Sequence, residues 1–172
     1  MSPSTGNARP YDGNGHYYAF TSQKIKWHDA LNEANKSEFN GTNGYLATIT
    51  SSGENYFIRD KSNAGYSTTN NAFLGGTDEN SYTNEGRWLW YGSYAPEHNT
   101  VFRDNGQNYI YANWNNGEPN NSHNQDFLHM YTSGYWDDHD PDSVGGYITE
   151  WGVGGAEYYL KVSTSNGTEG QS

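Results

Sequence analysis

The first helix is predicted where apolar residues recur at intervals of three and four, the spacing that buries one face of a helix. These residues are Trp27, Ala30, Leu31 and Ala34. An Asn-Gly pair follows as a stop signal, so this helix should run to about Glu38. A second helix is predicted after Ser51, because Ser51 and Glu54 form a capping box ahead of an apolar run. It should end near Lys61.

Short runs rich in aromatic and β-branched residues frame these helices and predict strands. The runs lie at 16–20, 45–49, 72–76, 87–92, 126–131, 146–151 and 157–162. No periodic segment is visible between Tyr91 and Asp126. A stretch of that length without regular structure is uncommon in a compact domain unless it is functional or disordered, and Trp114 argues against disorder. We therefore expect a functional loop region there.

The chain has 172 residues, which suits a single domain. Residues 1–15 and 163–172 are rich in Gly, Ser, Thr and Asn and lack periodicity, so we expect tails or linkers there. The domain itself should span 16–162. Aromatic residues make up 16% of the chain and all hydrophobic residues only 32%, so Trp and Tyr must supply much of the buried surface.

Charge narrows the classes of partner. The 20 acidic and 9 basic residues give a formal net charge of −11, which repels nucleic acid and anionic membrane surfaces and suits metal cations. No run approaches the roughly 20 consecutive apolar residues that cross a bilayer, and the first ten residues do not resemble a signal peptide. Cysteine is absent, which excludes disulfides, thiolate zinc sites and Cys nucleophiles. We expect no nucleic-acid partner and no membrane insertion.

Oxygen-bearing side chains gather in three segments of the sequence. They are Asp78, Glu79, Asn80 and Glu85; then Glu118, Asn120, Asn121, Gln125 and Asp126; then Asp137, Asp138, Asp140 and Asp142. Calcium takes about 6–8 oxygen ligands from carboxylates, amides and backbone carbonyls, so this composition fits calcium better than zinc or copper. Acidic, Asn-rich loops are also common as solvated turns, and any one segment taken alone favours that interpretation.

Other chemistries have less support. Asp138, Asp140 and Asp142 are spaced like the start of an EF-hand loop, but Ser143 stands where that loop needs Gly and no helices flank it. The histidines match no zinc-ligand spacing, and no Gly-x-Ser-x-Gly turn supports a serine nucleophile. Trp88 and Trp90 alternate along a predicted strand, which favours core positions over stacking on sugars.

From His16 to Glu150, the order of motifs resembles the C-type lectin domain. Eight segments carry the resemblance: WHDALNEA, GYLATITSSGENYFI, AFLGG, NEGRWLW, WNNGEPNN, QDFLHM, YWDD and YITE. The resemblance implies an α+β, C-type lectin-like fold, with two helices packed on small antiparallel sheets and a long calcium-binding loop region. Phe127 and Thr149 stand where the family has cysteines, so packing, calcium or both must hold the long loop.

The Glu-Pro-Asn motif bears most directly on function. In the family, a Glu and an Asn separated by one cis-proline direct both side chains toward one calcium, and this order is that of members taking mannose, fucose, glucose or N-acetylglucosamine. Glu118 and Asn120 match the motif. The carboxylate would accept a hydrogen bond from one sugar hydroxyl while the amide donates to its neighbour. The resemblance implies Ca²⁺ as cofactor and fucosylated or mannose-type glycans as ligands.

Further ligands follow from the same resemblance. Asp137 and Asp138 match the family's Trp-Asn-Asp motif with Asp in place of Asn, and the family's acidic pair falls on Gln125 and Asp126, either of which would reach the sugar-site calcium. The implied ligands of that ion are Glu118, Asn120, Gln125, Asp126, Asp137 and Asp138. A second calcium would map to Asp78, Glu85, Asn121 and Asp126. Sugar contacts are expected from Glu118, Asn120, Gln125 and Asp137, and from the neighbouring His123 and Tyr135.

The function implied is calcium-dependent carbohydrate binding without catalysis. Cysteine-free members of this fold are typical of bacterial surface proteins, so we expect an extracellular, cell-surface module tethered within a larger RTX-type adhesin. Fucose should outrank mannose, because its methyl group can be buried against aromatic residues. The alternative is the same fold binding a protein, a peptide or ice without sugar. An enzyme of the related formylglycine-generating fold is disfavoured, because that fold relies on cysteines.

Overall fold

The computed structural model describes residues 8–59, 71–142 and 144–152. In chain order its elements are β1 (Arg9–Pro10), β2 (Tyr17–Thr21), α1 (Trp27–Lys36), β3 (Glu38–Phe39), β4 (Thr42–Asn43), β5 (Tyr45–Leu46), α2 (Ser52–Arg59), β6 (Ala72–Thr77), β7 (Trp88–Trp90), β8 (Val101–Asp104), β9 (Gln107–Asn108), β10 (Phe127–Met130), β11 (Trp136–His139) and β12 (Tyr147–Trp151). The strand expected at 157–162 and the helix end expected near Lys61 lie outside the described residues.

Helix α1 buries the four residues whose spacing predicted it. It ends at Lys36, two residues before the expected Glu38. The reason is Ser37, which has extended backbone angles and whose Oγ donates to Ala34 O at 2.8 Å. Glu38 then begins a short hairpin, in which β3 pairs with β4.

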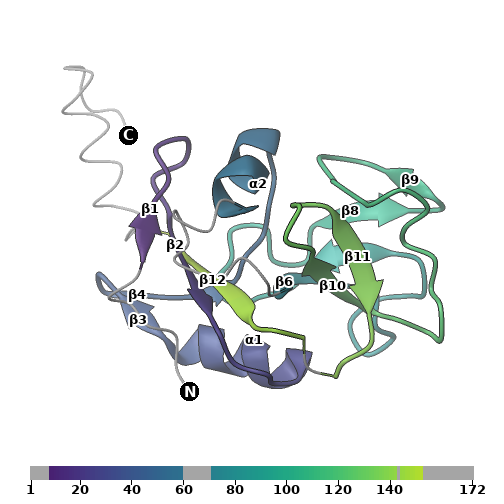
Figure 1. The fold of residues 1–172 in the computed structure, drawn as a ribbon, viewed down its shortest axis with the longest axis horizontal. Coiled ribbons are helices and arrows are strands. Elements are labelled where there is room, and N and C mark those ends of the chain that lie inside the picture. The colour runs from purple at the N-terminus through teal and green to yellow at the C-terminus, as the bar shows by residue number, and fades with distance from the viewer. Residues whose placement is uncertain (1–7, 60–70, 143, 153–172) are drawn as a thin grey trace.

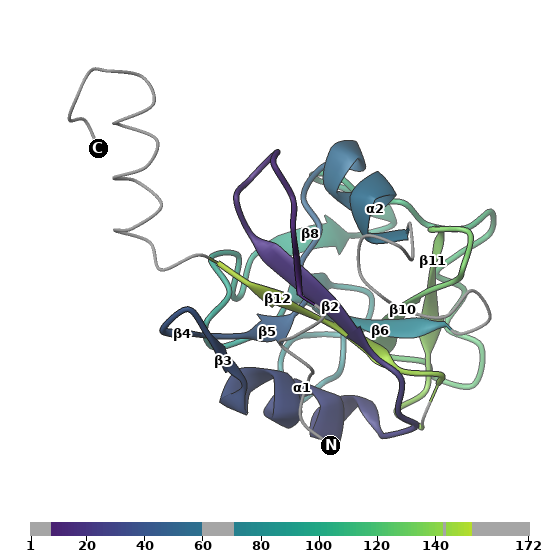
Figure 2. The same cartoon turned by 60° about the vertical axis from the view of Figure 1, so that its left-hand side comes forward.

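Helix α2 begins at the predicted cap. The Glu54 N–H donates to Ser51 Oγ at 3.1 Å, as a capping box requires. In a capping box the Glu side chain accepts from the N–H of the capping residue itself, here Ser51. The Glu54 carboxylate instead accepts from the N–H of the preceding residue, Thr50, at 2.9 Å. Figures 1 and 2 show α1 and α2 on opposite sides of the β2–β12 pair.

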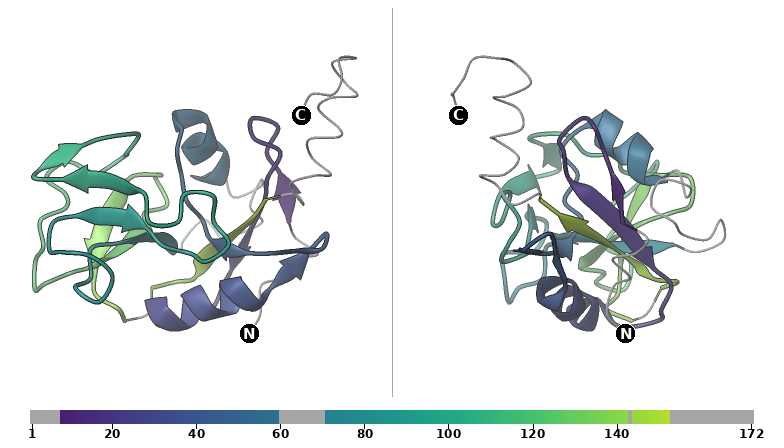
Figure 3. Two further views of the ribbon diagram at one scale, coloured as in Figure 1. Left: turned by 180° about the vertical axis from the view of Figure 1, so that it is seen from behind. Right: turned by 90° about the vertical axis from the view of Figure 1, so that its left-hand side faces the viewer.

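The main sheet runs in the order β1-β2-β12-β6-β7-β8-β9, while β10 pairs with β6 and β11, and β5 pairs with β12. Among the described residues, β12 and β6 form a parallel pair and the other strand pairs are antiparallel. Strands β8, β9 and β11 stand at the end of the molecule away from β1 (Figures 1 and 3).

Three features differ from the sequence-based expectations. Strand β1 lies inside the range 1–15, expected to be a tail, and pairs with β2, while Tyr11 packs on Phe57 with ring centroids 4.9 Å apart. Strands β8 and β9 fall where no regular structure was expected. Their turn, Asn105-Gly106, has φ values of 53° and 74°, which suits a two-residue hairpin turn. Strand β11 was not predicted either.

Aromatic residues supply much of the core, as composition predicted. Trp88, Trp90 and Trp136 are at most 1% exposed and pack around Phe102. Trp88 and Trp90 are therefore core residues, the interpretation that their alternation favoured. No helix in the described part of the chain combines the length and apolar character that spanning a bilayer requires.

Candidate metal centre

Three carboxylates from two distant segments meet at one end of the molecule. Glu118, Asp137 and Asp138 each offer an oxygen within 4.8 Å of the others, and we call them the first acidic cluster. Asp137 and Asp138 lie on β11, and Glu118 lies in the loop between β9 and β10. Both segments are at the same end of the fold (Figures 1 and 3).

Backbone pairing fixes the loop against β11. The Trp136 N–H donates to Asn113 O at 2.9 Å, and the Asn115 N–H donates to Trp136 O at 2.8 Å. Trp136 is fully buried, so this junction is anchored in the core. The sequence thus positions Glu118 three residues beyond a firmly held point, next to the two aspartates of β11.

The Glu-Pro-Asn motif contains the cis-proline that the resemblance implied. The Glu118–Pro119 bond is cis. The Asn120 N–H donates to Glu118 Oε1 at 3.1 Å and to Asp138 Oδ1 at 3.3 Å, and the Asn120 amide Nδ2 lies 3.4 Å from Glu118 Oε2. Glu118 and Asn120 therefore lie side by side, beside Asp138.

Asp138 ties the loop backbone to the cluster. It is fully buried, and its Oδ2 accepts from the Asn121 N–H at 2.6 Å. Asp137 is held from the other side, because its Oδ2 accepts from Tyr131 Oη at 2.6 Å and faces His129 Nε2 at 3.4 Å. His129 lies directly opposite Asp137 in the β10–β11 pair.

The first cluster concentrates negative charge. Burial, together with the nearby Asp137 and Asp138, raises the pKa of Glu118 to about 8. Burial also raises the pKa of Asp138. Burial acts in the same direction on Asp137, but the hydrogen bonds from His129 and Tyr131 outweigh it and hold the pKa of Asp137 below its usual range. A bound cation would remove this repulsion and favour the ionised form of all three.

A second acidic cluster lies where β6 ends and β10 begins. It consists of Asp78, Glu85 and Asp126, again with oxygens within 4.8 Å of one another. Asp78 Oδ2 accepts from the Gly86 N–H at 2.9 Å, and Asp126 O accepts from the Asp78 N–H at 3.1 Å. Burial and the neighbouring carboxylates raise the pKa of Asp78 to about 8 and that of Asp126 to about 6.

Buried oxygens without donors show that both clusters fit a hard cation. Asp137 Oδ1, Asp78 Oδ1 and Asp126 Oδ1 are inaccessible and accept no hydrogen bond from the described residues. A buried carboxylate oxygen left without a partner costs free energy. The carboxylate oxygens of both clusters are the donors that calcium prefers. The Asn120 amide oxygen accepts a hydrogen bond from the Ser122 N–H at 2.9 Å and keeps a second lone pair for a further interaction. The residues present therefore fit calcium.

The remaining predicted metal ligands are divided between the two acidic clusters. Asp126 lies in the second cluster, and Asn121 meets Asp138 through its backbone. The Gln125 amide lies by Ser122 O and Asp138 O, at 3.2 and 3.1 Å, distances at which its nitrogen donates to both. Of the adjacent residues Gln125 and Asp126, Gln125 is thus the one beside the first acidic cluster. Its amide nitrogen faces backbone carbonyls.

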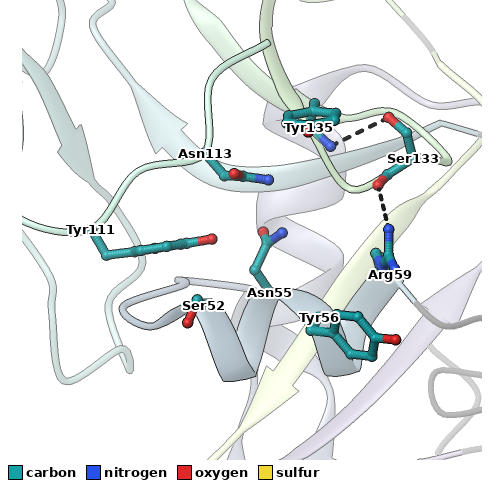
Figure 4. Close-up of a pocket in the computed structure, with 8 residues that line it drawn as sticks. All are labelled: Ser52, Asn55, Tyr56, Arg59, Tyr111, Asn113, Ser133 and Tyr135. Carbon is teal, nitrogen blue, oxygen red and sulfur yellow. Dashed lines mark hydrogen bonds between the residues drawn. The ribbon is translucent and has the colours of Figure 1, made fainter.

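The two expected sugar contacts differ in position. His123 lies in the loop between β9 and β10 that carries the Glu-Pro-Asn motif, which we call the motif loop. It is exposed, has a φ of 57°, and its Nδ1 lies 3.0 Å from Ser122 Oγ. Tyr135 instead lines a pocket beside α2 (Figure 4). Sequence reasoning missed His129 and Tyr131. The strand character of Trp136–His139 is the signal that would have placed His129 opposite Asp137 and Tyr131 two residues further along the same strand direction.

Known proteins resemble this chain in sequence and in fold. The family model for the lectin C-type domain matches residues 23–150. Halomucin of Haloquadratum walsbyi is 31% identical over 142 residues, which cover 81% of this chain and 1% of that protein. The hepatic lectin of Gallus gallus is 31% identical over 126 residues, 72% of this chain and 49% of that protein. The chain thus spans less than half the length of either relative.

Solved structures agree on the fold. The C-type lectin CEL-I from Cucumaria echinata has a TM-score of 0.64 at 19% identity, covering 84% of this chain and 94% of its own. Herring type II antifreeze protein has a TM-score of 0.59 at 20% identity, covering 84% of this chain and 94% of its own. The expected α+β, C-type lectin-like fold is therefore confirmed, and the chain belongs to the C-type lectin domain family.

Proposed function

We propose that this chain binds carbohydrate through a calcium ion held by Glu118, Asn120, Asp137 and Asp138. One observation carries the proposal: three carboxylates converge from the motif loop and β11, and one of their buried oxygens, Asp137 Oδ1, has no donor among the described residues. The family is one of binding proteins that generally recognise carbohydrate. The function is thus recognition, not catalysis.

The chemistry of sugar binding follows from the ligands. Calcium takes about 6–8 oxygens, and these four side chains supply four when each binds through one oxygen, so two vicinal hydroxyls of a sugar can complete its shell. Glu118 would accept a hydrogen bond from one hydroxyl, and the Asn120 amide would donate to the other. This arrangement of acceptor and donor supports mannose- or fucose-type glycans. A second calcium at Asp78, Glu85 and Asp126 would hold the β6 end against β10.

Fucose is the preferred ligand in this proposal. Exposed His123 stands in the motif loop, and its ring offers a surface for the methyl group that mannose lacks. A single monosaccharide bound by two hydroxyls gains little affinity, so useful binding requires neighbouring contacts or many copies. This chain matches 1% of halomucin, which supports a module within a much longer protein. We propose that this protein is an extracellular, cell-surface adhesin.

The alternative is binding to a protein, a peptide or ice without sugar. The similarity to herring type II antifreeze protein supports it, because that neighbour bears the same fold. A glycan array probed with calcium and again with EDTA discriminates between the two. The proposal predicts fucosylated or mannose-type spots that disappear with EDTA and with Glu118→Ala. An array without calcium-dependent spots would favour the alternative.

A further inference from the structure

A pocket of about 240 Å³ lies beside α2, and we call it the α2 pocket. It is lined by Asn55, Tyr56 and Arg59 of α2, by Tyr111 and Asn113 of the loop after β9, and by Tyr135 of the β10–β11 turn (Figure 4). Neither acidic cluster contributes to its lining. Sites for drug-sized ligands occupy about 300–1,000 Å³, so this volume suits a single sugar ring or a molecule of similar size.

The polar wall of the α2 pocket is fixed in place. The amides of Asn55 and Asn113 both donate to Gly134 O, at 3.0 and 2.8 Å. Asn55 Oδ1 also accepts from Trp136 Nε1 at 2.7 Å, and Asn55 is only 4% exposed. Each amide nitrogen has a second hydrogen to offer. Figure 4 shows the Tyr111 hydroxyl and both amides directed toward the same space.

Arg59 is held in one position by three contacts. Its side chain packs on Gly134, where an added Cβ would lie 2.8 Å from Arg59 Cδ and where φ is +94°, so glycine is required. Its Nη1 donates to Ser133 O at 3.1 Å, and its guanidinium lies 4.4 Å from the centre of the Tyr56 ring. Because a guanidinium has five N–H donors, most remain for a ligand.

The charge of the α2 pocket is opposite to that of the whole protein. Its lining contains Arg59 and no Asp or Glu, in a chain of formal net charge −11. Arg59 forms no ion pair with a carboxylate of the described residues. An anionic group would therefore find its favourable position at Arg59, where a carboxylate can be bound through two parallel hydrogen bonds.

Exposed aromatic surface accompanies this charge. Tyr56 is 63% exposed and Tyr135 is 49% exposed, so both rings offer surface to a ligand. Aromatic surface with a few fixed polar groups is a common composition for binding sites of small molecules. We propose that the α2 pocket binds a carboxylate-bearing sugar unit, a uronic acid, with Arg59 on the carboxylate and Tyr135 against the ring. That the ligand is a sugar rests on the proposed function, but this site needs no calcium.

The test is an NMR titration of the protein with D-glucuronic acid and with D-glucose in EDTA, repeated with glucuronic acid at saturating calcium. Glucuronic acid should bind at least about tenfold more tightly, because hydrogen bonds to a charged group contribute that much. Arg59→Gln should abolish the difference. Arg9→Gln, which removes the same charge elsewhere, should preserve it. Tyr135→Ala should weaken both sugars, and it changes a half-exposed side chain, so the fold should be unaffected.

The outcomes separate this inference from the calcium site. Equal binding of both sugars in EDTA, or a preference that survives Arg59→Gln, overturns it. Glucuronic acid that binds only with calcium and is lost in Glu118→Gln also overturns it, while leaving the calcium-dependent lectin intact. Conversely, binding in EDTA together with no calcium-dependent sugar binding upholds the α2 pocket and removes the function proposed for the first acidic cluster.

Discussion

Tyr131, the residue that follows β10, donates a hydrogen bond of 2.6 Å to Asp137 of β11. The bond occupies Asp137 Oδ2 and leaves the buried Oδ1 for the cluster that Asp137 forms with Glu118 and Asp138. Groups that orient a metal ligand in this way are worth roughly 10–100-fold in metal affinity. The strand pair thus sets the direction of a carboxylate that the motif loop cannot fix by itself.

Tyr131→Phe should lower calcium affinity about tenfold, because Asp137 loses the donor that orients it. The ring and its packing remain, so the melting temperature in EDTA should change little. Calorimetric titration with calcium measures the effect. Tyr109→Phe, which removes an exposed hydroxyl, serves as the matched control. Equal affinities for wild type and Tyr131→Phe would show that the hydrogen bond is dispensable.

Calcium should stabilise the fold, because both acidic clusters hold carboxylates that repel one another without a cation. By linkage, saturation at about 100 times the dissociation constant adds roughly 2.7 kcal/mol per site. The melting temperature should therefore fall when EDTA replaces calcium. Asp78→Asn should reduce this shift, since it removes one carboxylate of the second cluster. Identical melting curves in calcium and in EDTA would show that calcium does not bind to the folded protein.

Glu54 should make stability depend on pH. Burial and the charge of Glu150 raise the pKa of Glu54 to about 8. Between the unfolded pKa near 4 and this value, the folded chain holds a proton that the unfolded chain has released, so stability falls as pH rises. Glu54→Gln should flatten that decline in urea titrations at about pH 5 and pH 9 with saturating calcium. If the unfolding free energy of Glu54→Gln fell with pH as much as that of wild type, Glu54 would not be the source of the pH dependence. Glu38→Gln, which changes an exposed carboxylate, is the control.

Exchanging the motif's donor and acceptor should change the choice of sugar. Glu118→Gln combined with Asn120→Asp keeps size and net charge while reversing which side chain accepts from a hydroxyl. The double variant should shift from mannose or fucose toward galactose, as judged by competition with free sugars. If it still binds calcium and ranks the sugars as wild type does, recognition lies elsewhere.

The sequence predicted the helices well because their signals are local. The apolar spacing from Trp27 to Ala34 and the Ser51–Glu54 cap each lie within one or two turns, and both are present. The hairpin of β8 and β9 was missed although Asn105-Gly106 marks its turn, because its flanking strands are short and partly exposed.

At the metal centre, motif order predicted some residues of the site, but others depend on contacts between distant segments. Motif order placed Glu118, Asn120, Asp137 and Asp138 together, and the structure does bring them together. The roles of Tyr131 and His129 depend on the register of β10 with β11, and that register is set by tertiary packing around Trp136. Likewise, Asp126 and Gln125 are adjacent in sequence but lie beside different clusters, a separation that spacing alone did not predict.

Calorimetric titration with fucose and mannose, at saturating calcium and again in EDTA, tests the central claim most directly. Both sugars should bind with calcium, fucose ahead of mannose, and this binding should be lost in EDTA and in Glu118→Ala, where only the much weaker affinity of the α2 pocket for neutral sugars should remain. Mannose binding tenfold tighter than fucose, about 1.4 kcal/mol, would contradict the fucose preference alone. Sugar binding of equal affinity with and without calcium would contradict the claim itself.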